Sequence, residues 1–350
     1  RTCDTEHDNI RAAFHYLIGR GQVEWALRLA AALFRFWEQR ELVTEGRETL
    51  ARVLAMPGAE PSTPLRARTL YGASALADVQ GDLATAEAHS LEACDIYRQS
   101  GDMRGVAATI TVRGWQAQHG GRYAEAGARH AEAASLWQEL GDTAAVHLAR
   151  FNMATAAKAQ GDVALAGSVL NDLLASAESR HDLRAVASAL NGLGDLAATE
   201  NDYERAQRYH QRSLATFRQI DDRWGIAQVL TDIAEVDLRR RDFTAARATL
   251  LEALATFRAL GHQRGVARQL DRLSWCASRQ HRHEVAVRLT AAAAVTRKRI
   301  GVPLKPSERA RIDETLADAK AHMDPESYDA AWRTGHTATL DSILESEVSV

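Results

Sequence analysis

A short run of histidines is the first place in the 350-residue chain where residue types suggest chemistry. His281, Arg282 and His283 stand beside Glu284, and imidazole and carboxylate groups are common metal ligands. The run has no fixed geometry and no further ligand close by in the sequence, so a solvated turn is the simpler interpretation. We therefore expect no metal ion here.

Catalytic patterns are absent from the rest of the sequence. Carboxylates are numerous, but no pair has a spacing that separates an acid role from a base role. The three cysteines, Cys3, Cys94 and Cys276, lie far apart and form no C-x-x-C pair. The phosphate-binding motif G-x-x-x-x-G-K-[ST] does not occur. These observations predict a chain that is not an enzyme and that has no catalytic residues, cofactor or metal.

Charge and hydropathy weigh against nucleic-acid and membrane partners. The formal net charge is -3, so no excess of positive charge draws the chain to DNA, RNA or anionic lipid. The basic runs 239–241 and 297–299 fall at predicted C-terminal ends of helices, where the helix dipole favours cations; the alternative is a local acidic partner. No apolar run reaches the ~18 residues of a membrane span, and no signal peptide opens the chain. We expect a cytoplasmic protein.

Any functional site must be positioned by structural elements, and in this chain those elements recur at a regular interval. The segments GDLATA, GRYAEA, GDVALA, NDYERA, RDFTAA and HRHEVA start at residues 81, 121, 161, 201, 241 and 281, a step of 40 residues. A second landmark follows each of the first five about halfway along the step, so each unit holds two elements. Apolar residues recur at helical spacing, as Leu190, Leu193 and Ala197 do. Each unit is therefore predicted to be a helix hairpin, with helices near 104–119 and 123–139 in the clearest case.

Aspartates stand just before the predicted helices, where a side-chain oxygen can accept hydrogen bonds from the first turn. They are Asp82, Asp102, Asp142, Asp162, Asp182, Asp202, Asp222 and Asp242. Two positions in every unit are small, which lets paired helices approach closely. In the first helix these are Ser74, Gly114, Ala154, Gly194, Ala234 and Ser274, and in the second Ala86, Ala126, Ala166, Ala206, Ala246 and Ala286.

This pattern, with Tyr123, Tyr203 and Phe243 opening the second helix, resembles tetratricopeptide repeats (TPRs). The resemblance implies an all-α fold, a right-handed α-solenoid of TPR helix hairpins, here with a 40-residue repeat in place of about 34 residues. One hairpin cannot bury its own apolar face, so stacked hairpins share a continuous core. We expect an N-terminal helical cap and atypical hairpin at 1–64, six TPR hairpins at 65–300, and C-terminal capping helices and a tail at 301–350.

The two ends depart from the repeat. Helices are predicted near 6–19, 23–39 and 43–55, before a proline-rich connector at 57–64. EHDNIRAAFHYLIGRG and EGRETL near the start, and VAVRLTAAAAVTRKRIGVPLKPSERARIDETL and YDAAWRTGHTATLDSIL near the end, resemble the C-terminal sensor region of bacterial STAND-type ATPases and LuxR-like multidomain regulators. The resemblance implies that ATPase or effector modules precede this segment in the same polypeptide. Because the chain begins at Arg1, we interpret it as an excised piece.

In TPR proteins the first helix of each hairpin, the A helix, lines a concave groove. Carried over to this sequence, the resemblance implies that the groove is lined by Arg68, Tyr71, Asp78, Trp115, Gln118, His119, Phe151, Asn152, Lys158, Asn191, Asp195, Gln228, Asp232, Glu235, Arg268, Asp271, Arg272 and Trp275. The set mixes aromatic, amide and charged groups, as binding surfaces do. The alternative is that several are solvated or pair with one another, for example Asp271 with Arg268. Asn152 matches the asparagine with which TPR proteins often hold a peptide backbone.

We expect a non-catalytic domain that binds a protein, a peptide or a small-molecule effector in this groove. The family resemblance makes it the sensor of a larger bacterial signalling ATPase or transcriptional regulator. A ligand that bridges several A helices would favour one curvature of the solenoid and shift its population. A stand-alone TPR scaffold and a peptide-pheromone-type receptor remain as alternatives.

Overall fold

Helices account for every regular element in residues 6–40, 42–302, 304, 306–342 and 344, the part of the chain that the computed structural model describes. The chain divides into two units, Arg1–Leu173 and Leu174–Val350. Unit 1 contains α2 (His7–Gly19), α3 (Val23–Gln39), α4 (Val43–Leu54), α5 (Pro64–Val79), α6 (Leu83–Ser100), α7 (Met103–His119), α8 (Tyr123–Glu139) and α9 (Thr143–Gln160). The division falls within α10 (Val163–Ser179).

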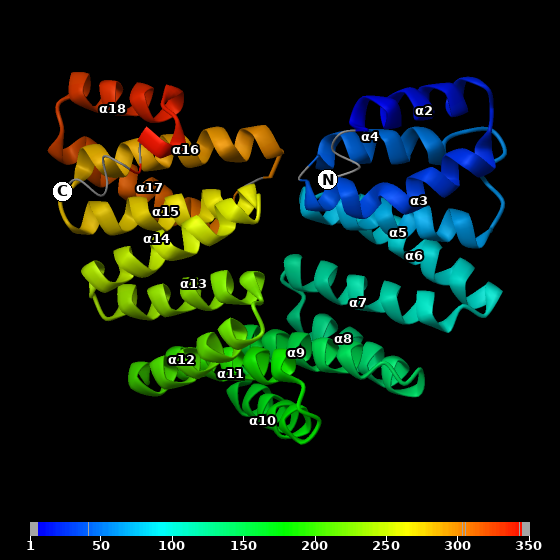
Figure 1. Ribbon diagram of the computed structural model, residues 1–350, viewed down its shortest axis with the longest axis horizontal. Helices are drawn as coiled ribbons and strands as arrows, with labels where there is room; N and C mark the ends of the chain where they lie inside the picture. The colour runs from blue at the N-terminus through cyan, green and yellow to red at the C-terminus, as the bar shows by residue number, and fades with distance from the viewer. Residues whose placement is uncertain (1–5, 41, 303, 305, 343, 345–350) are drawn as a thin grey trace. The chain divides into compact units, whose positions relative to one another are not determined.

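Unit 2 continues the same pattern. Its helices are α11 (Leu183–Thr199), α12 (Tyr203–Gln219), α13 (Arg223–Arg239), α14 (Phe243–Ala259), α15 (Gln263–Arg279), α16 (His283–Ile300), α17 (Pro306–His322) and α18 (Pro325–Thr337). Helices pair as α5 with α6 and α7 with α8 in unit 1, and as α11 with α12, α13 with α14 and α15 with α16 in unit 2 (Figure 1). The predicted fold class is confirmed: these are the hairpins of an all-α, TPR-like solenoid. None of the helices in the described residues is long and apolar enough to span a bilayer.

Aspartate side chains cap the repeat helices, as the sequence predicts. Asp102 Oδ1 accepts a hydrogen bond of 2.8 Å from the backbone N–H of Gly105 in the first turn of α7. The same contact is made by Asp82, Asp142, Asp162, Asp182, Asp202, Asp222 and Asp242. Before α15, His262 replaces the aspartate, and its Nδ1 accepts from the Gly265 N–H at 2.8 Å. The caps fix where each helix begins.

The predicted small residues lie where the two helices of a hairpin cross. Gly114 and Gly194 each face a buried histidine of the second helix, His130 and His210, and a Cβ at Gly194 would lie 2.5 Å from His210 Cε1. In the last repeat the same positions hold Ser274 and Thr290, whose hydroxyls are 2.6 Å apart. Close approach of the helices is therefore achieved with different residue pairs in different repeats.

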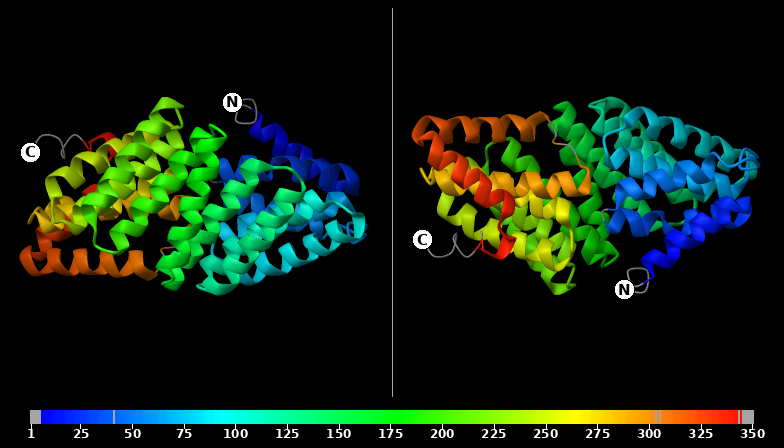
Figure 2. Two further views of the ribbon diagram at one scale, coloured as in Figure 1. Left: turned by 90° about the horizontal axis from the view of Figure 1, so that it is seen from below. Right: turned by 90° about the horizontal axis from the view of Figure 1, so that it is seen from above.

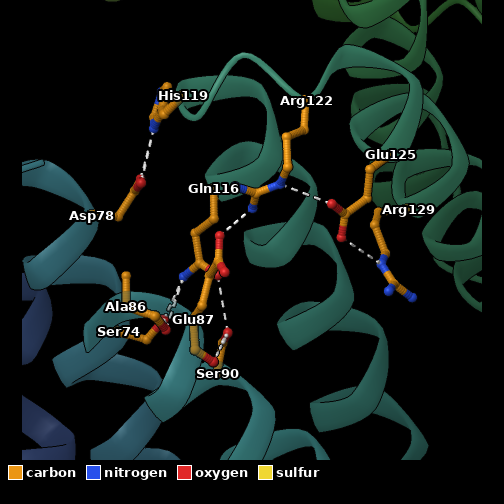
Figure 3. A network of polar contacts seen from close by, with 10 residues as sticks. All are labelled: Ser74, Asp78, Ala86, Glu87, Ser90, Gln116, His119, Arg122, Glu125 and Arg129. Carbon is orange, nitrogen blue, oxygen red and sulfur yellow. Dashed lines mark hydrogen bonds and ion pairs between the residues drawn. The ribbon is translucent and has the colours of Figure 1, made fainter. Parts of the chain in front are cut away.

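In the first repeat the crossing is polar and ties one hairpin to the next (Figure 3). Ser74 of α5, Ser90 of α6 and Gln116 of α7 are fully buried. Gln116 Nε2 donates to Ser74 Oγ at 2.6 Å, and Ser90 Oγ donates to Gln116 Oε1 at 2.9 Å. Ser74 Oγ donates to the Ala86 carbonyl at 2.9 Å. Because a buried polar group costs stability when unpaired, this network selects one packing of α7 against α5 and α6.

The N-terminal helices pack on the repeat through large apolar side chains. The predicted helices near 6–19, 23–39 and 43–55 are confirmed to within a residue at each end. Trp37 of α3 is 1% exposed and lies against Phe14 of α2, with ring centroids 5.7 Å apart. Gly46 of α4 approaches Trp37 so closely that a Cβ there would lie 2.8 Å from the Trp37 Cβ. Leu76 of α5 belongs to the same apolar cluster as Phe14 and Trp37. The core of α2 to α4 is thus continuous with that of α5.

The last two helices break the hairpin pattern. α17 starts close to the place where the 40-residue step from α15 predicts a helix, but α18 packs mainly against α16 and only slightly against α17 (Figures 1 and 2). Gly335 of α18 approaches the backbone of Arg288 in α16 so closely that a Cβ on residue 335 would overlap the Arg288 carbonyl oxygen. Ala331 of α18 is buried against Val287 of α16. Small residues therefore allow α18 to cover α16.

Candidate ligand-binding surface on the A helices

The predicted groove residues divide into two sets, one in each unit, which we call the unit 1 face and the unit 2 face. The unit 1 face lies on α5, α7 and α9 and consists of Arg68, Tyr71, Asp78, Trp115, Gln118, His119, Phe151, Asn152 and Lys158. The unit 2 face lies on α11, α13 and α15 and consists of Asn191, Asp195, Gln228, Asp232, Glu235, Arg268, Asp271, Arg272 and Trp275. Arg68 and His119 are exposed and the others are half-buried.

Some members of the unit 1 face serve packing. Tyr71 meets Phe34 of α3 edge-on, with ring centroids 5.6 Å apart, and burial raises the pKa of its phenol. Asp78 and His119 join the ends of α5 and α7, because the carboxylate lies 2.9 Å from His119 Nδ1 (Figure 3). Tyr71 thus packs α5 against α3, and the Asp78–His119 pair joins two A helices. All three residues are less available to a ligand.

Two amide side chains of the unit 1 face have unmatched polar atoms. Gln118 Oε1 and Asn152 Nδ2 are buried, and neither has a hydrogen-bond partner among the described residues. Gln118 Oε1 is a hydrogen-bond acceptor and Asn152 Nδ2 is a donor. They are complementary to the N–H donor and the C=O acceptor of a peptide backbone. The two atoms are inaccessible in this conformation, so a ligand reaches them only if the amide side chains rotate outward. Since a buried, unpaired polar atom costs about 1–3 kcal/mol, such pairing would recover that cost. Trp115 and Phe151, half-buried on the same helices, add apolar surface.

In unit 2, by contrast, amides and carboxylates pair with one another. Asn191 Nδ2 donates to Asp232 Oδ2 at 2.8 Å, which joins α11 to α13. Asn191 Oδ1 lies 2.9 Å from Nδ1 of His210, the buried histidine of α12. Asp195 Oδ1 lies 3.9 Å from the other ring nitrogen of His210. In these contacts the predicted groove residues pair within the chain, which was the alternative to binding a ligand.

Glu235 lies at the centre of an ion-pair network that α17 completes. Its carboxylate is 3.1 Å from Arg311 of α17, 3.7 Å from Arg272 of α15 and 4.0 Å from Arg239 of α13. Burial alone would raise the pKa of Glu235, but the hydrogen bonds and charge of Arg311, with the charges of Arg272 and Arg239, outweigh it and lower the pKa. The glutamate is therefore a structural anion.

The same helix covers Trp275. The guanidinium of Arg311 lies 5.0 Å from the centre of the Trp275 indole, and that of Arg279 lies 5.3 Å from it. The indole also meets Phe243 edge-on at 6.2 Å. Cations over an indole face are attracted by its π electrons, so this tryptophan contributes to the attachment of α17.

The suggested pairing of Asp271 with Arg268 is replaced by two other contacts. Arg268 Nε lies 3.3 Å from Glu308 of α17. Asp271 forms its ion pair with Arg297 of α16. Burial raises the pKa of Asp271 to about 6, more than the Arg297 charge lowers it. Local helical spacing missed these contacts because both partners come from later helices.

α17 lies outside the predicted groove, although the repeat contains the signal that would place it there. Adding 40 residues to α15 (Gln263–Arg279) places a further A helix near 303–319, and α17 spans Pro306–His322. Glu308 and Arg311 are thus A-helix residues that pair with the unit 2 face. Of the two faces, unit 1 retains the unpaired amides. In unit 2 most side chains have partners within the chain, although single atoms such as Asp271 Oδ1 and Trp275 Nε1 lack a hydrogen bond.

A separate pocket of about 330 Å³ lies between α4, α5 and α6. It is lined by Thr44, Arg47, Glu48, Ala51, Ala73, Gln80, Thr85 and His89, none of which belongs to either face. Arg47 already pairs with Asp82 at 2.5 Å and donates to Gln80 Oε1 at 2.7 Å. Arg47 is the cation of this pocket, and it is already paired. We therefore consider the pocket a weaker candidate binding site than the unit 1 face.

The chain resembles proteins of known structure in its fold. No protein-family model matches the chain, and no curated protein matches it. A solved structure of NprR in complex with its cognate peptide NprX is 13% identical, covers 94% of this chain and 93% of its own, and has a TM-score of 0.54. The apo form of RapI is 12% identical over 79% of this chain and 99% of its own, with a TM-score of 0.52.

A third structure, a Rap protein complexed with competence and sporulation factor, is 14% identical over 71% of this chain and 74% of its own, with a TM-score of 0.50. At these identities the likeness establishes the arrangement of helices alone. The class that fold and comparisons define is the TPR-like helical solenoid.

Proposed function

We propose that the chain is a non-catalytic peptide- or protein-binding domain whose ligand lies on the unit 1 face. The observation that carries the proposal is the pair of buried amide atoms without hydrogen-bond partners, Gln118 Oε1 and Asn152 Nδ2. An extended backbone supplies an N–H to the glutamine oxygen and a carbonyl to the asparagine nitrogen. Trp115 and Phe151 contact an apolar side chain of the ligand.

The two complexes described above support a peptide over a small molecule. NprR is seen with its cognate peptide NprX, and the Rap protein with competence and sporulation factor. Both share the fold of this chain but little of its sequence, so they support the class of ligand and not its identity. A peptide-pheromone-type receptor is the form of the proposal that these likenesses favour.

The test begins with a peptide selected from a random phage-displayed library on the purified chain. Its affinity is then measured by fluorescence anisotropy for the wild type, Asn152→Ala and Trp115→Ala. We expect Asn152→Ala to weaken binding about ten-fold, the loss of roughly 1.4 kcal/mol from one hydrogen bond. Trp115→Ala is expected to weaken it at least as much.

Matched controls separate the face from general effects of substitution. Asn171→Ala removes an exposed asparagine of α10, and Trp25→Ala removes a tryptophan of α3 that is 61% exposed. Both should bind within about two-fold of the wild type. Equal affinity in all variants that keep wild-type circular dichroism would place the ligand elsewhere, and failure to select any peptide would count against a peptide ligand.

We also propose that this domain is the sensor part of a larger cytoplasmic bacterial regulator, either a signalling ATPase or a transcriptional regulator. The sequence resemblance of its two ends supports this context. In such a regulator, a ligand that bridges α7 and α9 would favour one arrangement of the A helices. This preference would shift the attached modules between their inactive and active conformations. The test is nucleotide turnover by the full-length polypeptide with and without the selected peptide. A full-length polypeptide without a nucleotide-binding module would favour a stand-alone scaffold.

A further inference from the structure

Two imidazoles and a carboxylate meet between α16 and α17, far from the unit 1 face in sequence. His283 is the first residue of α16, and Asp318 and His322 lie one helical turn apart on α17. Asp318 Oδ2 lies 3.5 Å from His283 Nδ1, and Asp318 Oδ1 lies 3.3 Å from His322 Nδ1. One ligand atom from each of the three side chains lies within 4.8 Å of the other two.

These distances are close to those between ligands of a single metal ion. A tetrahedral ion with ligands at about 2.0–2.1 Å holds them about 3.3 Å apart. Both carboxylate-to-imidazole distances are already near this value. His322 Nδ1 also lies 2.9 Å from the backbone carbonyl oxygen of Asp318, so metal binding requires the His322 ring to exchange that contact or to offer its other nitrogen. The i, i+4 spacing of Asp318 and His322 is the spacing by which helices present two metal ligands on one face.

The arrangement of the two imidazoles also favours a shared ligand. The His283 and His322 rings are stacked, with centroids 4.7 Å apart and planes 3° from parallel. The side chain of His283 is only 11% exposed, and its Nδ1 has no hydrogen-bond partner. A metal ion supplies the partner that this buried nitrogen lacks.

Neighbouring residues orient the carboxylate. Ser278 Oγ donates to Asp318 Oδ2 at 2.5 Å, and this hydrogen bond is the main cause of the lowered pKa of Asp318. Arg279, a neighbouring cation, forms an ion pair with Glu314 one turn earlier on α17. Hydrogen bonds to a ligating carboxylate are a regular feature of metal sites.

We propose that His283, Asp318 and His322 bind a divalent transition-metal ion, with Zn²⁺ the best match to two imidazoles and one carboxylate. His322 is 54% exposed, which leaves room for water at the remaining coordination position. The ion joins the start of α16 to the end of α17. Because α17 also carries Glu308 and Arg311, the metal stabilises the helix that covers the unit 2 face.

The test is calorimetric titration of the tag-free full chain with Zn²⁺ at pH 7.5, with Mg²⁺ as the metal that prefers oxygen ligands. We expect one Zn²⁺ per chain and no comparable Mg²⁺ binding. His322→Ala should weaken binding at least ten-fold without loss of fold, because the side chain is half-exposed. His336→Ala, which removes an exposed histidine of α18, is the matched control and should bind as the wild type does.

A second measurement uses Co²⁺ as a spectroscopic probe in the same site. The visible absorption of bound Co²⁺ should appear with the wild type and His336→Ala and be lost with His322→Ala. No saturable Zn²⁺ binding by the wild type, or equal binding by wild type and His322→Ala, would overturn the proposal. The peptide experiment concerns different helices, so either proposal can fail while the other stands.

Discussion

The ring of His130 occupies the space that a side chain on residue 114 would need. Gly114 of α7 faces this histidine of α8, and a Cβ on the glycine would overlap the imidazole. The equivalent residues in the other repeats are matched in size or polarity: Ser74 with Ser90, Ala154 with Leu170, Gly194 with His210, Ala234 with Leu250, and Ser274 with Thr290. The largest partner occurs only where the first helix has glycine, so the two positions compensate in volume.

This compensation predicts a rescue between two substitutions. Gly114→Ala alone should lower the free energy of unfolding by about 1–3 kcal/mol, because the methyl group overpacks the crossing. Adding His130→Leu recreates the alanine–leucine pair of two other repeats and should restore wild-type stability or exceed it, since alanine is the better helix residue by about 1 kcal/mol. Urea unfolding followed by circular dichroism measures both. Additive losses in the double variant would contradict the compensation.

The helix hairpins could be predicted from the sequence, but the ion-pair partners of the charged groove residues could not. The 40-residue step, the aspartate caps and the small residues at crossings are local signals, and each predicted helix begins or ends close to where the pattern places it. The partner of Asp271 was not predictable in this way, because Arg297 lies 26 residues away in the sequence on the next helix. Glu235 and Arg311 are 76 residues apart. Such pairs depend on how helices from different hairpins and from the two positions of a hairpin pack together, for which helical periodicity carries no information.

Asp237 gives the stability of the protein a specific dependence on pH. It is 6% exposed, and burial, with the charge of Asp242, raises its pKa to about 6 despite Arg240. The ordinary pKa of an aspartate is 3.8, and we take this value for the unfolded chain. Between pH 4 and 6 the folded state therefore holds more protons, and this group's contribution to stability falls as pH rises through that window.

Asp237→Asn should remove this dependence. We expect the variant to gain about 1–3 kcal/mol over the wild type at pH 8 and to lose most of that advantage at pH 4. Asp95→Asn, at an aspartate whose side chain is 62% exposed, is the control and should change little at either pH. Unfolding free energies at pH 4, 6 and 8 provide the measurement, and a constant difference between variant and wild type would exclude this role for Asp237.

The turns of unit 2 offer a stabilising substitution. Arg241 precedes the cap Asp242 with a φ of +63°, a left-handed conformation that glycine adopts at the equivalent residues 81, 121 and 161. Arg241→Gly should raise the free energy of unfolding by about 0.5–1 kcal/mol, because the steric cost of the side chain exceeds the entropy that glycine adds to the unfolded chain. Arg240→Gly, one residue earlier at a φ of −73°, should destabilise. The two variants must therefore differ in sign when measured by urea unfolding.

The attachment of α17 depends on Glu235. Replacing it with glutamine leaves Arg272 and Arg311 without their anion, and we expect a loss of about 2–4 kcal/mol, since removing one partner exposes the cost of burying the other. Glu38→Gln is matched in exposure, 30% against 26% for Glu235, but breaks a single pair with the exposed Arg35. That variant should lose less than about 1 kcal/mol. Hydrogen exchange resolves where the loss occurs: the amides of α17 should exchange faster in Glu235→Gln and be unchanged in Glu38→Gln. Unchanged exchange in α17 in both variants would mean that apolar packing, and not this network, holds the helix.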